Sequence, residues 1–222
     1  MAEFRTLFQV VRERGVARTL PVLVSHLADL RFEARYGTDT VSWVRIEDLE
    51  IDSDNKDRAV DYQPTQRLPL MRLLETLDIP RDRVFLDLGS GKGKALLIAA
   101  EFGFETLRGV EFSPELCRVA EDNCEKYRKR TGNRTSFRII ESDAILYEFT
   151  DEAVIYLFNP FDAWVLRFVM ENLAQSLQTH PRRAWIIYRR PLHREVIERV
   201  EGIRLLGEYR CWGSDFCVFT AG

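Results

Sequence analysis

The segment from Val84 to Lys94 constrains the fold of this chain more than any other stretch of its sequence. A short apolar run, Val84–Leu88, contains Asp87 and ends at a turn with glycine at positions 89, 91 and 93. A helix-like segment follows the turn directly. Glycine permits positive φ and carries no β-carbon, so the backbone of such a turn can approach a ligand closely. We therefore expect a buried strand whose end faces a nucleoside-bearing ligand.

From about residue 83 onward, strand patterns alternate with helix patterns. Strands are expected at 84–88, 107–112, 136–140, 153–158 and 184–188, and helices at 94–102, 114–130, 164–177 and 192–201. A further helix is expected at 68–77, ahead of the first strand. Such alternation predicts a parallel sheet with helices on both faces. The last two strands, at 205–209 and 216–220, are joined by a short turn and must run antiparallel to each other. The expected fold class is α/β, a doubly wound seven-stranded sheet that is mostly parallel with an antiparallel last strand.

The first 61 residues do not share this alternation. Apolar residues have helical spacing from Phe4 to Val11 and again from Leu20 to Leu30. Residues 48–61 are polar and acidic, which predicts a loop. We therefore expect an N-terminal helical extension or cap at 1–61, followed by one α/β domain at 62–222.

Composition and cysteine spacing argue against several classes of function. The formal net charge of −3 gives no strong overall field, so a nucleic-acid substrate is not expected. The four cysteines form no Cys-x-x-Cys pair and only three histidines occur, so we expect no metal site. The N-terminus lacks the layout of a secretion signal, and the run from Leu20 to Leu30 is too short to span a bilayer. We expect a cytoplasmic protein with reduced cysteines, either a monomer or a homodimer.

The glycine turn favours S-adenosylmethionine over a dinucleotide. This cofactor carries a carboxylate and an ammonium on its methionine end. The free N–H groups of the turn and of the helix N-terminus suit the carboxylate, while Asp87 suits the ammonium. A dinucleotide fingerprint would have its third glycine where this chain has Lys94. Cofactor contacts are therefore predicted at Asp87, Gly89, Ser90, Gly91 and Gly93.

Acidic residues also follow the next two predicted strands. Glu111 ends the second strand, where an acidic residue binds ribose hydroxyls in dinucleotide folds, and the ribose of S-adenosylmethionine presents the same hydroxyls. Phe112 beside it is placed to pack against adenine. Asp143 and Ala144 follow the third strand, and Asp143 is placed to accept a hydrogen bond from the adenine amino group. Because ligands bind at the carboxyl edge of open sheets, we expect these residues and Asp87 to surround one cofactor.

Residues 62–222 resemble the class I, Rossmann-like S-adenosylmethionine-dependent methyltransferases. The motifs that carry this resemblance are Asp87-Leu88-Gly89-Ser90-Gly91-Lys92-Gly93, Glu111-Phe112-Ser113-Pro114, Ser142-Asp143-Ala144 and Asn159-Pro160-Phe161. Within the class, the first two motifs look like those of bacterial relatives of the non-SET protein-lysine methyltransferases. Tyr62-x-Pro64 is similar to the segment that covers the cofactor in those enzymes. The resemblance implies a Rossmann-like fold, cofactor contacts at Asp87, Gly89, Gly91, Glu111 and Asp143, and Tyr62 over the cofactor.

Asn159-Pro160-Phe161, after the fourth strand, is the expected site of methyl transfer. In amino-methylating members of the class, an Asn/Asp-Pro-Pro-aromatic motif orients the target NH₂. The Asn oxygen and a prolyl carbonyl accept its hydrogens, and the ring stabilises the developing cation. By this resemblance Asn159, Pro160 and Phe161 are the predicted catalytic residues, with Asn159 also bordering the cofactor. One proline of the motif is missing, and a simple strand-to-helix turn is the alternative interpretation.

Three functions fit this pattern. The leading prediction is methyl transfer to a nitrogen, with a protein lysine as one candidate acceptor. The second is O-methylation of a small metabolite or glycan, and the third is an S-adenosylmethionine-binding interaction module without activity. Arg189 and Arg190, after the fifth strand, would suit an anionic substrate in the same cleft. The acceptor, protein or small molecule, stays open at this point.

Overall fold

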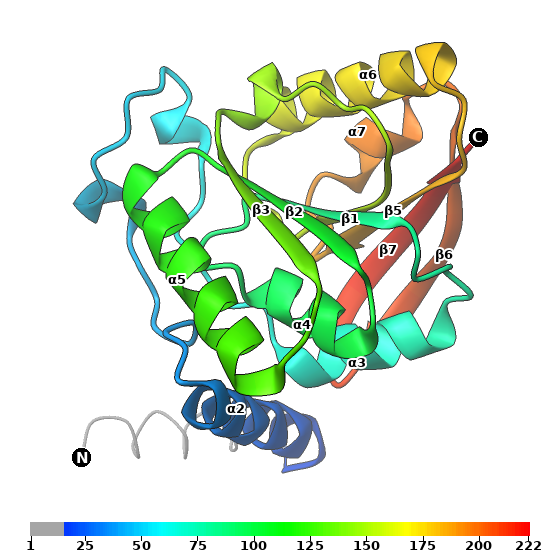
Figure 1. Cartoon of the computed structure of the whole chain (residues 1–222). Helices are drawn as coiled ribbons and strands as arrows, with labels where there is room; N and C mark the ends of the chain where they lie inside the picture. Colours follow the sequence, from blue (N-terminus) through cyan, green and yellow to red (C-terminus); the bar gives the residue numbers. More distant parts are fainter. Residues whose placement is uncertain (1–15) are drawn as a thin grey trace.

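The computed structural model describes residues 16–222, in which a seven-stranded sheet lies between two layers of helices (Figure 1). The strand order is β3-β2-β1-β4-β5-β7-β6. The first five strands pair in parallel, whereas β7 is antiparallel to both of its neighbours, β5 and β6. The predicted α/β class with an antiparallel last strand is confirmed. The strands are β1 (Val84–Leu88), β2 (Thr106–Glu111), β3 (Ser136–Glu141), β4 (Glu152–Leu157), β5 (Ala184–Arg189), β6 (Ile203–Cys211) and β7 (Ser214–Ala221).

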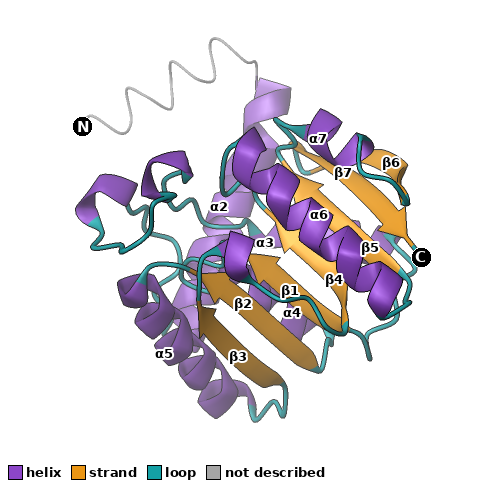
Figure 2. Cartoon of the chain, turned by 90° about the horizontal axis from the view of Figure 1, so that it is seen from above, coloured by secondary structure: helices purple, strands orange, loops and turns teal. Residues whose placement is uncertain are grey.

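Helices α3, α4 and α5 cover one face of the sheet and α6 and α7 cover the other (Figure 2). Helix α7 begins two residues later than predicted, because the Leu192 N–H donates to the Arg190 carbonyl in a tight turn. No helix within residues 16–222 has both the length and the apolar character that a membrane crossing requires. The helices are α2 (Val16–Tyr36), α3 (Arg67–Thr76), α4 (Lys94–Phe102), α5 (Pro114–Thr131), α6 (Ala163–Thr179) and α7 (Arg194–Glu198), with the 3₁₀ turns η1 (Ile46–Asp48), η2 (Lys56–Arg58) and η3 (Ala144–Leu146).

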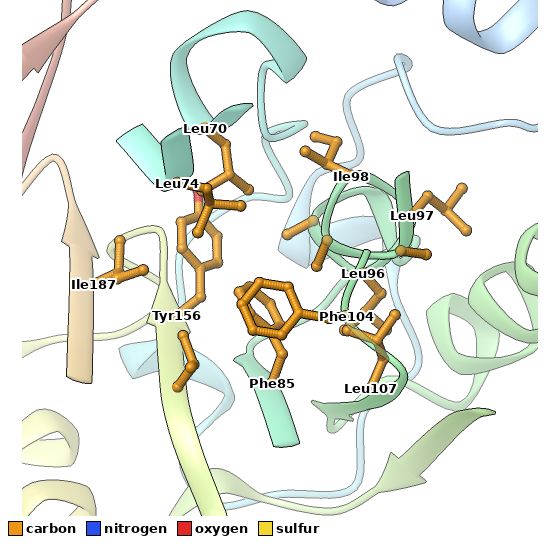
Figure 3. Close-up of a cluster of buried hydrophobic side chains, with 14 of the residues drawn as sticks. Leu70, Leu74, Phe85, Leu96, Leu97, Ile98, Phe104, Leu107, Tyr156 and Ile187 are labelled. Atoms are coloured by element: carbon orange, nitrogen blue, oxygen red, sulfur yellow. The ribbon is translucent and has the colours of Figure 1, made fainter. Parts of the chain in front are cut away.

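Each face of the sheet has its own apolar core. The core beneath α3 and α4 is built around Phe85 of β1, whose ring centroid lies 5.2 Å from that of Phe104 and 6.2 Å from that of Tyr156 (Figure 3). On the opposite face, Leu86 and Leu88 belong to the core beneath α6. Because successive side chains of a strand point to opposite faces, Asp87 lies on the same face as Phe85, next to an apolar layer. The strand pattern therefore places a carboxylate where water is scarce.

The N-terminal part of the described chain packs on the helices and then crosses the cavity at the sheet edge. Helix α2 packs against α5, with the ring centroids of Tyr36 and Tyr127 4.8 Å apart. Residues 44–62, which we call the strap, begin and end at an isolated β-bridge between Val44 and Tyr62. Near its end, Ala59 pairs with Phe161 after β4. The helix predicted from Phe4 to Val11 lies outside the described residues.

Candidate active site

A cavity lies at the carboxyl ends of β1, β2 and β4, beneath the strap. It encloses about 90 Å³. Twelve of the thirteen predicted site residues line it: Tyr62, Asp87, Gly89, Ser90, Gly91, Glu111, Phe112, Asp143, Ala144, Asn159, Pro160 and Phe161. The exception is Gly93, which is the N-cap of α4, and a β-carbon there would come within 3.3 Å of Ala120 on α5. Gly93 therefore allows two helices to pack closely, and the structure gives it no direct place in the cavity.

The glycine turn makes room for other parts of the protein as well as for a ligand. Gly89 and Gly91 have φ of 72° and 51°, in the left-handed region. A β-carbon at Gly89 would lie 2.5 Å from Cβ of Pro160, and one at Gly91 would lie 2.1 Å from Cδ2 of Tyr62. The turn is therefore covered on one side by Asn159-Pro160-Phe161, which we call the transfer motif, and on the other by Tyr62, the last residue of the strap.

Glu111 holds the turn from the neighbouring strand. Its Oε2 accepts the Gly91 N–H at 2.8 Å, and its Oε1 accepts the N–H groups of Phe112 and Ser113, each at 3.0 Å. Burial raises the pKa of this carboxyl, while the three N–H donors lower it and leave a net rise. Glu111 thus fixes the backbone of the predicted cofactor site, and one lone pair of Oε2 stays free for a further donor.

Asp87 is the most unusual carboxyl group of the cavity. It is 4% exposed, and no residue within 16–222 donates a hydrogen bond to its carboxylate. Burial, followed by the nearby charge of Glu111, raises the pKa of Asp87 well above its usual value. A buried carboxylate without a partner is costly, and a cationic ligand group would remove much of that cost.

Asp143 lines the cavity with its carboxylate already bonded to the protein. Oδ1 accepts the Ile145 N–H at 3.0 Å. Oδ2 accepts hydrogen bonds from Ser53 Oγ at 2.7 Å and from Asn55 Nδ2 at 2.8 Å. Since Ser53 and Asn55 belong to the strap, Asp143 ties the strap to the end of β3. One lone pair of Oδ1 stays free for the predicted adenine contact.

The transfer motif has a strained backbone at Asn159, and two of its oxygens already accept one hydrogen bond each. Asn159 has φ of 45° and is 7% exposed. Its Oδ1 accepts a hydrogen bond from the Tyr188 hydroxyl at 2.8 Å, and the Pro160 carbonyl accepts the Val60 N–H at 3.1 Å. Each oxygen keeps one free lone pair. Phe161 lines the cavity but is otherwise buried in the core beneath α6.

Only one of the two predicted arginines lines the cavity in the structure. Arg190 lines the cavity and has φ of 50°, a second strained position at this edge. Arg189 does not line the cavity. Its guanidinium lies 4.0 Å from the centroid of Phe158 and donates to Gln66 Oε1 at 2.9 Å and to Ser214 Oγ at 3.1 Å. Arg189 is therefore a buried packing residue in this arrangement.

Three residues of the site were not identified from the sequence. Tyr188 supports Asn159 from β5, and nothing in the pattern of a buried strand distinguishes it from a core residue. Gly109 lies mid-strand on β2, where a β-carbon would come within 2.7 Å of Ser90 Oγ. A glycine inside a strand is a signal of close approach that the sequence does offer.

Lys94 is the third of these residues. It lines the cavity, while its ammonium lies 3.8 Å from Asp29 and 3.9 Å from the centroid of Phe32, both on α2.

Sequence comparisons place this chain near methyltransferases. A family model described as "Histone methylation protein DOT1" matches residues 59–155. A protein-lysine N-methyltransferase of Saccharolobus islandicus is 37% identical over 68 residues, which cover 30% of this chain and 42% of the relative. EEF1A lysine methyltransferase 2 of Homo sapiens is 35% identical over 57 residues, which cover 26% of this chain and 24% of that protein. The matched stretches therefore span less than half the length of these curated relatives.

Structure comparison gives a broader match. An RNA methyltransferase from Salinibacter ruber, solved in complex with S-adenosyl-L-homocysteine, superposes with a TM-score of 0.54 at 20% identity. The match covers 71% of this chain and 93% of that chain. At this level of identity the likeness shows a shared fold, and it confirms the fold implied by the sequence motifs.

Proposed function

Since the chain has the Rossmann-like fold of class I methyltransferases, we propose that it transfers the methyl group of S-adenosylmethionine to a nitrogen atom, with a protein lysine as the acceptor. One observation carries the proposal. Asp87 is a buried carboxylate without a donor among residues 16–222, and it lies next to a glycine turn held by Glu111. The ammonium of the methionine moiety is the group that such a carboxylate fits.

The other polar groups of the cavity fit the remaining parts of the cofactor. The N–H groups of the glycine turn suit the methionine carboxylate. Glu111 has a free lone pair on Oε2 for a ribose hydroxyl, and Asp143 has one on Oδ1 for the adenine amino group. When bound, the cofactor supplies an electrophilic methyl group on a sulfonium.

Asn159 and Pro160 are proposed to orient the acceptor. The free lone pairs on Asn159 Oδ1 and on the Pro160 carbonyl can accept the two hydrogens of an amine, which points the nitrogen lone pair toward the methyl group. Tyr188 holds the Asn159 oxygen in place through its hydroxyl. The amine must arrive uncharged, and burial favours that form because it lowers the pKa of an ammonium. Orientation and desolvation are then sufficient without a dedicated base.

The names of the two curated relatives support a lysine acceptor, since both are lysine methyltransferases. The decisive experiment is transfer of a radiolabelled methyl group from S-adenosylmethionine into a fractionated lysate, with Asp87→Ala as the inactive control. We expect label in the protein fraction, recovered as methylated lysine after hydrolysis. Label in small molecules or in nucleic acid would contradict the acceptor. Cofactor binding without any transfer would favour a binding module.

We further propose that the described part (residues 16–61) of the extension predicted at 1–61 caps the acceptor side of the site. We also propose that the protein is cytoplasmic. Lining of the cavity by the strap residues Ile46, Leu49 and Val60 supports the cap. The four cysteines are free and buried, which suits a reducing compartment. Hydrogen exchange in the strap should slow when S-adenosylmethionine binds, and recovery of the protein in a secreted fraction would contradict the location.

A further inference from the structure

Lys92, at the centre of the glycine turn, is buried without being one of the residues that line the cavity. It is 5% exposed. Its ammonium lies 3.0 Å from each carboxylate oxygen of Asp39 and 2.6 Å from Ser42 Oγ. Asp39 and Ser42 lie in the loop that follows α2. This ion pair therefore joins the predicted cofactor-binding turn to the N-terminal part of the chain.

The loop that carries Asp39 is held from two further sides. Asn123 of α5 donates to the carbonyl oxygens of Asp39 at 2.8 Å and Lys92 at 3.0 Å, and its Oδ1 accepts the Asp39 N–H at 2.8 Å. Glu33 of α2 accepts the N–H groups of Thr40 and Val41. These contacts fix the position of the Thr40 carbonyl relative to the glycine turn.

Tyr62 depends on that carbonyl. Its hydroxyl donates to Thr40 O at 2.9 Å, while its ring lies against Gly91. Burial, and after it the charge of Asp87, raises the pKa of Tyr62 well above its usual value, so the hydroxyl stays protonated and continues to donate. The position of Tyr62, and with it the end of the strap, is thus linked through the Asp39 loop to Lys92.

The space beneath the strap is smaller than a drug-sized ligand needs. The cavity encloses about 90 Å³, whereas pockets for ligands of this class measure about 300–1,000 Å³. The strap contributes Ile46, Leu49 and Val60 to the walls. Contacts that hold the strap in place therefore oppose both entry and release of a ligand.

We propose that Lys92 is a positioning residue for the cofactor: its ion pair with Asp39 holds Tyr62 and the strap over the glycine turn and thereby slows cofactor release. The inference rests on the proposed function, because it takes S-adenosylmethionine as the ligand. Lys92 acts through Asp39 and Tyr62 and does not itself touch the ligand. Loss of the pair lowers the fraction of ligand-bound molecules whose strap is closed, so the cofactor leaves faster.

The first test needs no ligand. Hydrogen exchange of the Val60 and Tyr62 amides, which donate to Pro160 O and Val44 O, reports on strap opening. Lys92→Met and Asp39→Asn should each speed this exchange about fivefold, because a partly exposed charge-assisted pair is lost. Lys129→Met removes an equal charge from an exposed pair with Glu125 and should change nothing. Unchanged exchange in both test variants would overturn the role of Lys92.

The second test measures release of S-adenosylmethionine from the full chain by rapid dilution. Lys92→Met and Asp39→Asn should each release it about fivefold faster, the double variant no faster than either, and Lys92→Arg within about twofold of wild type. Leu173→Ala creates a cavity in the core beneath α6, on the other face of the sheet. It controls for a general loss of stability and should leave the rate of release unchanged. Additive effects in the double variant, or equal acceleration by Leu173→Ala, would overturn the proposal. A wild-type protein that binds no S-adenosylmethionine would refute the proposed function itself, whatever the exchange data show.

Discussion

Replacement of Gly91 by alanine tests the packing of the strap on the glycine turn. The new β-carbon would lie 2.1 and 2.3 Å from two ring carbons of Tyr62, where carbon atoms normally approach to about 3.5–4.0 Å. Gly91 also has φ of 51°, which an L-residue adopts at a cost of about 1–2 kcal/mol. Displacement of the ring adds about 1–3 kcal/mol of overpacking. We therefore expect Gly91→Ala to lower the free energy of unfolding by about 2–5 kcal/mol.

Gly132 provides the matched control. It has φ of 66° at the end of α5, and a β-carbon there would meet nothing within 4 Å. Gly132→Ala should therefore show the backbone cost alone, about 1–2 kcal/mol. Urea denaturation followed by circular dichroism gives both values. In a Tyr62→Ala background the penalty of Gly91→Ala should fall to that of Gly132→Ala. Equal penalties for Gly91→Ala with and without the Tyr62 ring would refute this packing.

Three further predictions concern the cavity. Burial raises the pKa of Asp87 in the folded protein above its usual value of 3.8, so the stability of the ligand-free protein should fall as pH rises from about 4 through the folded pKa. In urea denaturation, Asp87→Asn should show a flatter dependence of stability on pH and higher stability at pH 7. The same variant should bind S-adenosylmethionine more weakly. Glu111→Gln keeps the shape of the side chain but places an amide NH₂ where one carboxylate oxygen now accepts an N–H. Calorimetry should therefore show about 10-fold weaker cofactor binding. Unchanged affinity would count against the ribose contact. Asn159→Ala should cut turnover about 100-fold with near-normal cofactor affinity, and Tyr188→Phe should cut it less; equal turnover in Asn159→Ala and wild type would remove the orienting role.

The order of elements was largely predictable because their periodicities are strong. The strand at Val84–Leu88 and the helix at Lys94–Phe102 have the predicted limits. Ser113 caps α5 as expected, with its Oγ accepting the Leu116 N–H at 3.3 Å. These features depend on local chemistry: apolar runs, glycine turns and a serine–proline start are visible within a few residues of sequence.

What the sequence could not provide depends on contacts between distant segments. The pairing of the strap with the transfer motif brings Val60 to Pro160, a hundred residues later in the chain. Asp39 meets Lys92 through a loop whose composition resembles any polar connection. Arg189 was predicted near the cleft, but its position one residue before Arg190 turns it to the opposite side of the strand end, where Phe158 and Gln66 bury it. Strand alternation predicts such a reversal only when the last residue of the strand is known.

We infer that the sheet edge around Asp87 and Glu111 binds S-adenosylmethionine. Isothermal titration calorimetry of the wild-type protein with S-adenosylmethionine, and separately with NAD, tests it most directly. We expect saturable binding of S-adenosylmethionine with one site per chain, strong loss of affinity in Asp87→Ala, and no binding of NAD. Binding of NAD but not of S-adenosylmethionine, or equal affinity in wild type and Asp87→Ala, would contradict it.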